Sequence, residues 1–105
     1  MTDNELMAWF MGWGRCQNGL WVGCPEGAHY KLTFDTSWNE LMPVIEKIGN
    51  FQSRPDRITR IEITDCGTRI DVLGERIFYN SSVEGSMLAA TYKAAVHAIK
   101  LINGL

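Results

Sequence analysis

The stretch RIEITDCGTRIDV, residues 60–72, decides how this chain folds. Two runs in which apolar β-branched residues alternate with charged ones, residues 60–64 and 69–72, flank a short segment that contains Gly67. Such alternation is typical of strands with one buried face, and glycine supplies the positive φ that a tight hairpin turn requires. The sequence therefore predicts an antiparallel hairpin in which Gly67 has φ > 0.

A turn centred on residues 66–67 would determine the register of this hairpin. Apolar β-branched side chains then face each other on the buried side, and two carboxylates face each other on the solvent side. The predicted pairs are Ile63 with Ile70, Ile61 with Val72, and Glu62 with Asp71. We expect the like-charged pair to lie in water beside Arg60 and Arg69.

Outside the hairpin, helical periodicity marks three segments, residues 3–12, 38–48 and 82–103. Each opens with Ser or Thr followed three residues later by Glu, a pattern in which two side chains cap backbone amides reciprocally. These pairs are Thr2 with Glu5, Ser37 with Glu40, and Ser81 with Glu84. Pro43 would be the sixth helical residue of the middle segment, so we expect it to break one hydrogen bond and kink that helix.

Further short strands are expected on both sides of the middle helix. Residues 20–23 and 29–34 flank a Pro-Glu-Gly turn at 25–27, with Tyr30, Leu32 and Phe34 facing inward, and residues 76–79 follow the main hairpin. The element order is then α-β-β-α-β-β-(β)-α. This order predicts a single α+β domain, residues 1–105, in which three helices pack against an antiparallel sheet of four to five strands.

Composition narrows the class of protein. The 105 residues are 46% hydrophobic and 21% charged, which excludes disordered and membrane-spanning chains, and the net charge of −2 argues against a general nucleic-acid binder. The N-terminal residues show no basic segment followed by an apolar run, and there are three cysteines, an odd number. We therefore expect free thiols, no membrane association and a location in the cytoplasm of a bacterial host.

Catalytic and metal-binding patterns are not evident. Cys16, Cys24, His29 and Cys66 are ligand types that zinc accepts, but they lack the paired Cys-x2–4-Cys spacing of structural zinc sites. The histidines, His29 and His97, show no sequence relation to a nucleophile, and no glycine-rich phosphate-binding motif occurs. The sequence predicts a protein that is not an enzyme, with no catalytic residue, cofactor or metal.

The four tryptophans and one arginine cluster supply the candidate binding residues. Tryptophans bury large areas in a core, but they are also frequent anchors of recognition surfaces, so both interpretations stay open. Trp21 has the strand parity opposite to Leu20 and Val22, so it would point outward if those two point inward. The candidate ligand- or partner-binding residues are Trp13, Trp21, His29, Lys31, Arg57 and Arg60.

Three further stretches carry a family resemblance: FMGW at 10–13, TSWNELMPVIEKI at 36–48 and TYKAAVHAIK at 91–100. They resemble small uncharacterised phage and prophage proteins of Bacteroidetes-like bacteria, in which F-M-G, T-S-W-x-x-L-M-P-V-x-E-K-I and Y-x-A-V motifs recur. Ala98 stands where those proteins often have an aromatic residue. The resemblance covers the three expected helices and little of the sheet. It implies the kind of source from which the protein comes, and it does not imply an activity.

Three functions follow from these observations. The first is a non-enzymatic phage- or prophage-type accessory protein that binds a macromolecular partner, with a protein partner or self-association as a homo-oligomer. The alternative is a protein that binds or sequesters a small nucleotide-like signal, stacking a base on Trp21 or Trp13 and holding phosphate with Arg57 or Arg60. Single-stranded nucleic-acid binding is a third reading, and the negative net charge argues against it.

Overall fold

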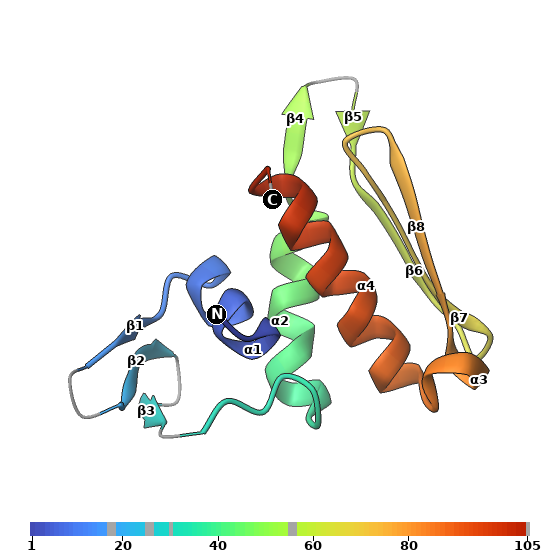
Figure 1. Cartoon of the computed structure of the whole chain (residues 1–105). Coiled ribbons are helices and arrows are strands. Elements are labelled where there is room, and N and C mark those ends of the chain that lie inside the picture. Colours follow the sequence, from blue (N-terminus) through green and yellow to red (C-terminus); the bar gives the residue numbers. More distant parts are fainter. Residues whose placement is uncertain (17–18, 25–26, 30, 55–56, 105) are drawn as a thin grey trace.

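The computed structural model describes residues 1–16, 19–24, 27–29, 31–54 and 57–104 and confirms an α+β fold (Figure 1). The helices are α1 (Asp3–Phe10), α2 (Trp38–Gly49), α3 (Ser81–Glu84) and α4 (Met87–Ile102). The strands are β1 (Gly14–Arg15), β2 (Trp21–Cys24), β3 (Gly27–His29), β4 (Gln52–Arg54), β5 (Arg57–Ile58), β6 (Arg60–Ile63), β7 (Gly67–Val72) and β8 (Glu75–Asn80). All observed pairings are antiparallel, as predicted.

The strands form three small sheets instead of the one sheet that we expected. Their orders are β1-β2-β3, β4-β5 and β6-β7-β8. The β1-β2-β3 sheet lies beyond α1 and α2 from the β6-β7-β8 sheet, so the helices separate the two (Figure 1). Because α1 and α2 fill the space between them, the early and late hairpins cannot share hydrogen bonds.

Helix α4 crosses one face of the β6-β7-β8 sheet and forms the centre of the core with it (Figure 1). Its buried face consists mainly of alanines, and small side chains let a helix approach a sheet closely. Helix α2 packs beside α4 and buries the predicted stripe. The stripe is Leu41, Val44, Ile45 and Ile48, and the alanines are Ala90, Ala94, Ala95 and Ala98.

The register of the main hairpin differs from the prediction by two residues. The observed partners are Arg60 with Asp71, Ile61 with Ile70, Glu62 with Arg69, and Ile63 with Thr68. A shift of two residues leaves every side chain on its predicted face, but it replaces the like-charged pair by pairs of opposite charge. Thr64 explains the tighter turn, because its hydroxyl accepts hydrogen bonds from the amides of Cys66 and Gly67.

Glycine is needed in two turns for different reasons. The third strand is confirmed as β8, which follows β7 through a turn of Leu73 (φ 54°) and Gly74 (φ 78°). Two consecutive residues at positive φ form the type I′ turn that suits a hairpin. Gly67 itself is not at positive φ, so that prediction is wrong: a Cβ there would lie 2.4 Å from the carbonyl oxygen of Tyr79.

The helix ends agree with the predictions only in part. Thr2 and Glu5 form the predicted capping box, whereas the side chain of Ser37 makes no capping bond. The helix expected over residues 82–103 is two helices, because Gly85 adopts φ 101° and ends α3. Their capping residues are Asn80 and Ser86, not Ser81.

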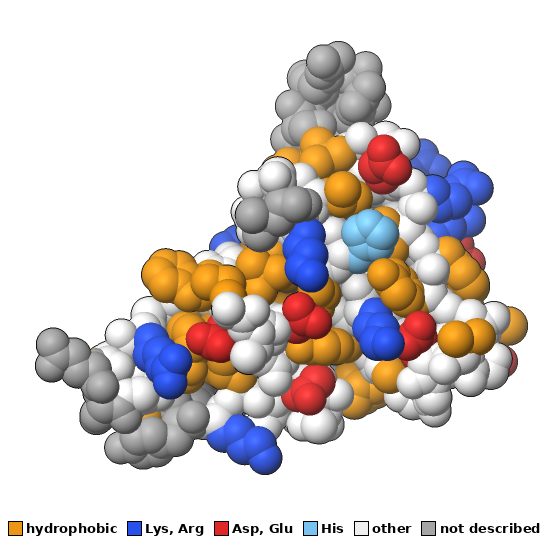
Figure 2. Space-filling view, in the orientation of Figure 1, with side chains coloured by type: hydrophobic (Ala, Val, Ile, Leu, Met, Phe, Trp, Pro, Cys, Tyr) orange, Lys and Arg blue, Asp and Glu red, His pale blue; other side chains and the backbone are white. Residues whose placement is uncertain are grey.

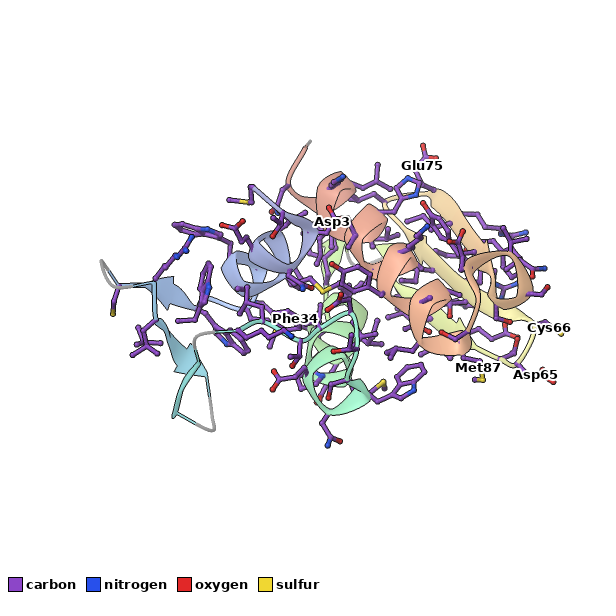
Figure 3. All side chains as sticks on the ribbon, turned by 60° about the horizontal axis from the view of Figure 1, so that its bottom comes forward. Asp3, Phe34, Asp65, Cys66, Glu75 and Met87 are labelled. Carbon is purple, nitrogen blue, oxygen red and sulfur yellow. The ribbon has the colours of Figure 1, made fainter. Side chains whose placement is uncertain are left out.

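The second strand of the early hairpin lies earlier in the chain than predicted. It spans Gly27–His29 and so includes Gly27 of the predicted turn, whereas Phe34 is buried from a segment that is not a strand. Figure 3 labels Phe34 where the chain returns from the β1-β2-β3 sheet to α2. Tyr30 and residues 25–26 of the predicted turn lie outside the described residues.

Candidate functional site

The two tryptophans that we considered as surface anchors are both buried. Trp13 is 7% exposed and packs against the ring of Phe34 with 5.1 Å between centroids. Trp21 is 3% exposed, so the prediction that it points outward is wrong. Neighbouring side chains do alternate here, but in the opposite sense: Val22 is 37% exposed, so the premise that it points inward fails. The larger side chain then takes the buried side, where it removes the most apolar area from water.

Trp9 is instead the exposed tryptophan, at 59%. The helical spacing of Leu6, Trp9, Phe10 and Trp13 in the sequence predicts one buried stripe that includes Trp9, but α1 buries Leu6, Met7 and Ala8. Its inner face is therefore rotated relative to that prediction. Residues 3–12 alone gave no signal for this rotation, because every side chain from Leu6 to Met11 is apolar.

Of the other candidate residues, the structure brings His29 next to Trp21, as its partner between β2 and β3, whereas Arg57 and Arg60 lie in other sheets. Lys31 is exposed near the β1-β2-β3 sheet, whereas Arg60 is exposed at the start of β6. The two sheets lie at opposite ends of the molecule in both ribbon views (Figures 1 and 3). His29 and Arg57 lie in β3 and β5, and their side chains are outside the described parts of the structure. Trp21 has Arg15 as its cationic neighbour, with the guanidinium carbon 5.8 Å from the ring centroid.

The most distinctive surface is the face of the β6-β7-β8 sheet opposite α4, which we call the open sheet face. The strand pairings place its outward side chains in two rows, and no described helix covers them. One row consists of Arg60, Asp71 and Arg76, and the other of Glu62, Arg69 and Phe78.

Ion pairs organise the charges of the open sheet face. Arg69 bridges the two rows, with its guanidinium 2.9 Å from Glu62 and 3.8 Å from Asp71. The Nε of Arg76 lies 3.4 Å from Oδ1 of Asp71, an oxygen that is buried and accepts no hydrogen bond from the described residues. Arg60 forms no ion pair with any described side chain. The face therefore offers one uncommitted guanidinium beside arginines that are already held in position.

Apolar groups and shallow hollows lie between these charges. Phe78 is 54% exposed, and Ile58, just before β6, is 65% exposed. A hollow of about 290 Å³ is lined by Ile58, Arg60, Asp71, Leu73, Gly74, Glu75 and Arg76. A smaller one of about 120 Å³ is lined by Glu62, Thr64, Gly67, Arg69 and Phe78. The open sheet face therefore combines shallow hollows, exposed apolar area and charges of both signs.

A second polar cluster lies on the solvent side of α4. The hydroxyl of Tyr79 is 3.2 Å from Nδ1 of His97, and the ammonium of Lys93 is 2.6 Å from Glu84. Its hydrogen bond to Glu84 raises the pKa of Lys93 above its ordinary value. Figure 2 shows blue, red and orange side chains around the pale-blue histidine of this cluster. A hollow of about 380 Å³ is lined by Asp3, Tyr79, Lys93, Val96, His97 and Lys100.

These groups show no arrangement for nucleophilic or metal chemistry within the described part of the chain. The partner of His97 is a phenol, and Cys16 and Cys66 are exposed free thiols on other elements. No cluster of three or more His, Cys, Asp or Glu side chains suited to a metal ion occurs among the described residues. No helix in the described ranges has both the length and the apolar character needed to cross a membrane.

Comparisons with known proteins found no relative, so a functional proposal rests on the open sheet face. The chain matches no protein-family model, no curated protein and no solved structure.

Proposed function

We propose that this chain is a non-enzymatic accessory protein, of the phage or prophage type that its helical motifs resemble, and that it acts by binding a protein partner through the open sheet face. The observation that carries this proposal is the exposed row of Glu62, Arg69 and Phe78 on a sheet that α4 covers from the other side only. Such a face exposes apolar surface that a partner can remove from water.

The residue types on the open sheet face fit a protein interface. Aromatic residues and arginine are the side chains most enriched at binding hot spots. Burying an exposed phenylalanine contributes about 1.5–3 kcal/mol, so Phe78 can act as an apolar anchor. Arg69 is already held by two carboxylates, so it loses little side-chain freedom on binding.

Charge and geometry favour a protein over the other partners that the sequence suggested. Glu62 and Asp71 interrupt the arginines, and a nucleic-acid groove needs a continuous basic surface. The nucleotide-like ligand required a tryptophan beside Arg57 or Arg60. Trp13 and Trp21 are buried at the other end of the molecule from Arg60, and none of the described residues that line the hollow next to Arg60 is aromatic.

The test begins with a photo-crosslinking amino acid at position 58 and, as a control, at Glu46 on the exposed side of α2. Expressed in the native host, the position 58 variant should form one adduct that the position 46 variant does not form. The captured protein is then purified and its Kd measured with charge-reversed variants. Arg60→Glu should weaken binding at least about tenfold, whereas Lys31→Glu at the other end should not.

Equal adducts at both positions would contradict the proposal. So would equal effects of Arg60→Glu and Lys31→Glu on the measured Kd. If the Arg60→Glu variant does not show the circular dichroism spectrum of the folded protein, Arg60→Gln is used in its place. Arg60→Gln removes only one charge from an exposed, unpaired side chain, so the described ion pairs stay intact.

A further inference from the structure

Strand β8 is an edge of its sheet, and its outer side has no strand partner among the described residues. Its pairing with β7 begins at Glu75 and Val72, on either side of the two-residue turn. In such a hairpin the residues next to the turn bond each other, and hydrogen bonding then alternates along the strand. Glu75, Ile77 and Tyr79 therefore bond β7, while Arg76 and Phe78 direct their N–H and C=O groups toward the free edge. Asn80 directs its N–H there, and as the N-cap of α3 it uses its C=O to begin that helix.

This edge lacks most of the features that normally protect an edge strand. Natural edges are short, bulged, interrupted by proline or rich in charged residues, lysine above all, because a regular edge adds strands from other chains. Strand β8 is six residues long, its register with β7 is continuous, and residues 75–80 contain neither proline nor lysine. Its two charged residues, Glu75 and Arg76, lie at the end next to the turn. At its centre stands Phe78, which is 54% exposed.

We propose that the free edge of β8 pairs antiparallel with the same edge of a second copy of this chain, with the twofold axis at Phe78. This places Phe78 opposite Phe78 of the second copy, and Arg76 opposite Asn80 on both sides. The two sheets become one, with α4 of each copy on the same side. The N–H and C=O groups of the two Phe78 residues bond each other, and the C=O of each Arg76 accepts a hydrogen bond from the N–H of Asn80 in the other copy.

Hydrogen bonding and side-chain pairing select this register over its neighbours. An edge-directed residue can bond only another edge-directed residue, so the register moves in steps of two residues and the twofold axis in steps of one. An axis at Ile77 would place Arg76 opposite Phe78 and Gly74 of the turn opposite Asn80, and an axis at Tyr79 would place Arg76 opposite Ser82 of α3. The axis at Phe78 keeps every edge-directed residue opposite a strand residue and pairs the two phenylalanines, and aromatic cross-strand pairs are stabilising.

The side chains on both faces also suit this pairing. On the open sheet face two exposed phenylalanines become neighbours and shield each other from water. On the face toward α4, Ile77 lies opposite Tyr79 of the second copy, which extends the apolar core across the axis. Each Arg76 meets a neutral amide residue, so its ion pair with Asp71 is retained.

Self-association rests on the edge of β8, and the proposed docking of a protein partner rests on the open sheet face, so the two proposals can fail separately. If both hold, the dimer presents two copies of the open sheet face side by side. A twofold-symmetric or repetitive partner would then be bound by both copies at once.

Disulfide trapping tests the register. In a background with all three native cysteines replaced by serine, Phe78→Cys puts two thiols opposite each other on strands whose Cα atoms are about 5.5 Å apart, a distance that a disulfide spans. The matched control is Val83→Cys, which is more exposed but lies on α3. Mild oxidation should convert Phe78→Cys to covalent dimer at least about tenfold faster than Val83→Cys. Equal rates would overturn the register.

Proline substitution tests the edge itself. Arg76→Pro removes an N–H that points to the free edge and keeps every bond to β7, while Arg76→Ala removes the same charge and keeps the N–H. Sedimentation equilibrium of the unmodified protein and of Arg76→Ala should give a dimer, and Arg76→Pro should give a monomer with unchanged circular dichroism. If Arg76→Pro does not fold, Phe78→Lys is measured instead and should also be monomeric.

Other outcomes overturn the proposal. If the unmodified protein stays monomeric at millimolar concentration, the edge of β8 does not pair with the same edge of a second copy. A dimer that survives both Arg76→Pro and Phe78→Lys uses a different surface. The protein could also stay monomeric, with the edge amides of β8 protected from hydrogen exchange only when the captured protein partner is added. The edge of β8 would then bind that partner and not a second copy of the chain.

Discussion

Gly67 is a position where one methyl group decides whether β7 and β8 can pair. A Cβ there would lie 2.4 Å from the carbonyl oxygen of Tyr79 and 2.7 Å from the ring of Phe78. The ring can turn away, but the carbonyl belongs to the sheet. We expect Gly67→Ala to lower the free energy of unfolding by about 1–3 kcal/mol, and Gly67→Val by more, measured by urea denaturation.

Gly49 provides the control for this prediction. It is the last residue of α2, and a Cβ there would be 3.6 Å from Cδ1 of Ile61, an ordinary contact. Gly49→Ala should leave stability unchanged or raise it by up to about 1 kcal/mol. Similar losses at both positions would show that the close approach at Gly67 is not responsible.

Single residues also show where sequence reasoning succeeds and fails. The requirement for glycine at position 67 was predictable from the hairpin pattern, but its cause was not, because the clash involves residues of a strand that joins later in the chain. The outward direction of Trp21 was wrong because Val22, and not Trp21, is the exposed one of the two. Alternation predicts that neighbouring side chains point to opposite faces, but Leu20, Trp21 and Val22 are all apolar, so it does not say which face is buried.

At the scale of elements, a buried pair of hydroxyls joins β7 to α4. The Oγ1 atoms of Thr68 and Thr91 are 2.7 Å apart and fully buried, and Thr91 donates its hydrogen to the carbonyl of Met87. Thr68 must therefore donate to Thr91. Thr91→Val should cost about 1–3 kcal/mol of unfolding free energy, because it leaves the buried Thr68 hydroxyl without an acceptor, and Thr68→Val should cost less.

The double variant completes a thermodynamic cycle for this pair. With both hydroxyls replaced by methyl groups no buried donor is left unpaired, so the double variant should be at least as stable as Thr91→Val alone. Chemical denaturation of the four proteins measures the coupling. Additive losses would show that the two hydroxyls do not interact.

The break between α3 and α4 was readable from the sequence, but another signal obscured it. Gly85 followed by Ser86 is a helix stop followed by a helix start. The Ser81…Glu84 pattern just before it also matched a helix start, and the apolar spacing beyond it favoured one long helix. Ser86→Ala should lower stability by about 1 kcal/mol, since its hydroxyl accepts from the amide of Ala89. Ser82→Ala, an exposed position in α3, should have a smaller effect on the thermal unfolding midpoint.

At the scale of the whole molecule, Asn4 connects three distant segments. Its side chain accepts a hydrogen bond from the Tyr92 hydroxyl at 2.9 Å and donates to the carbonyl of Leu32 and to Asp35. These contacts fasten α1 to α4 and to the segment that precedes α2. Burial, together with the nearby carboxylates of Asp3 and Asp35, raises the pKa of Tyr92 from 10.0 to about 12.

This pKa shift predicts alkaline sensitivity. The folded protein holds the phenol proton more tightly than the unfolded chain, so the stabilisation is complete below pH 10 and is lost as the pH rises toward about 12. Thermal unfolding across this range should show a steeper decline for the unmodified protein than for Tyr92→Phe. Tyr79→Phe is the control and should retain the steep decline. Parallel curves for Tyr92→Phe and the unmodified protein would contradict the assignment.

The candidate site lay largely beyond what the sequence could predict. Alternation in residues 60–72 predicted which side chains of the hairpin face away from the core, and this is confirmed. It could not predict that α4 covers one face and that the described chain leaves the other open, because that depends on where the helix folds back. A two-residue change of register was enough to turn the expected repulsion between Glu62 and Asp71 into ion pairs with arginine.

The unequal exposure of the tryptophans makes the protein a fluorescent reporter of its own N-terminal helix. Trp13 and Trp21 lie inside the fold and are shielded from collisional quenchers, whereas Trp9 stands out from α1 into water. Iodide or acrylamide should quench a red-shifted fraction of the emission that Trp9→Phe removes. A molecule that binds to α1 over Trp9 would then shift the tryptophan emission to shorter wavelength, so its binding can be followed without a label.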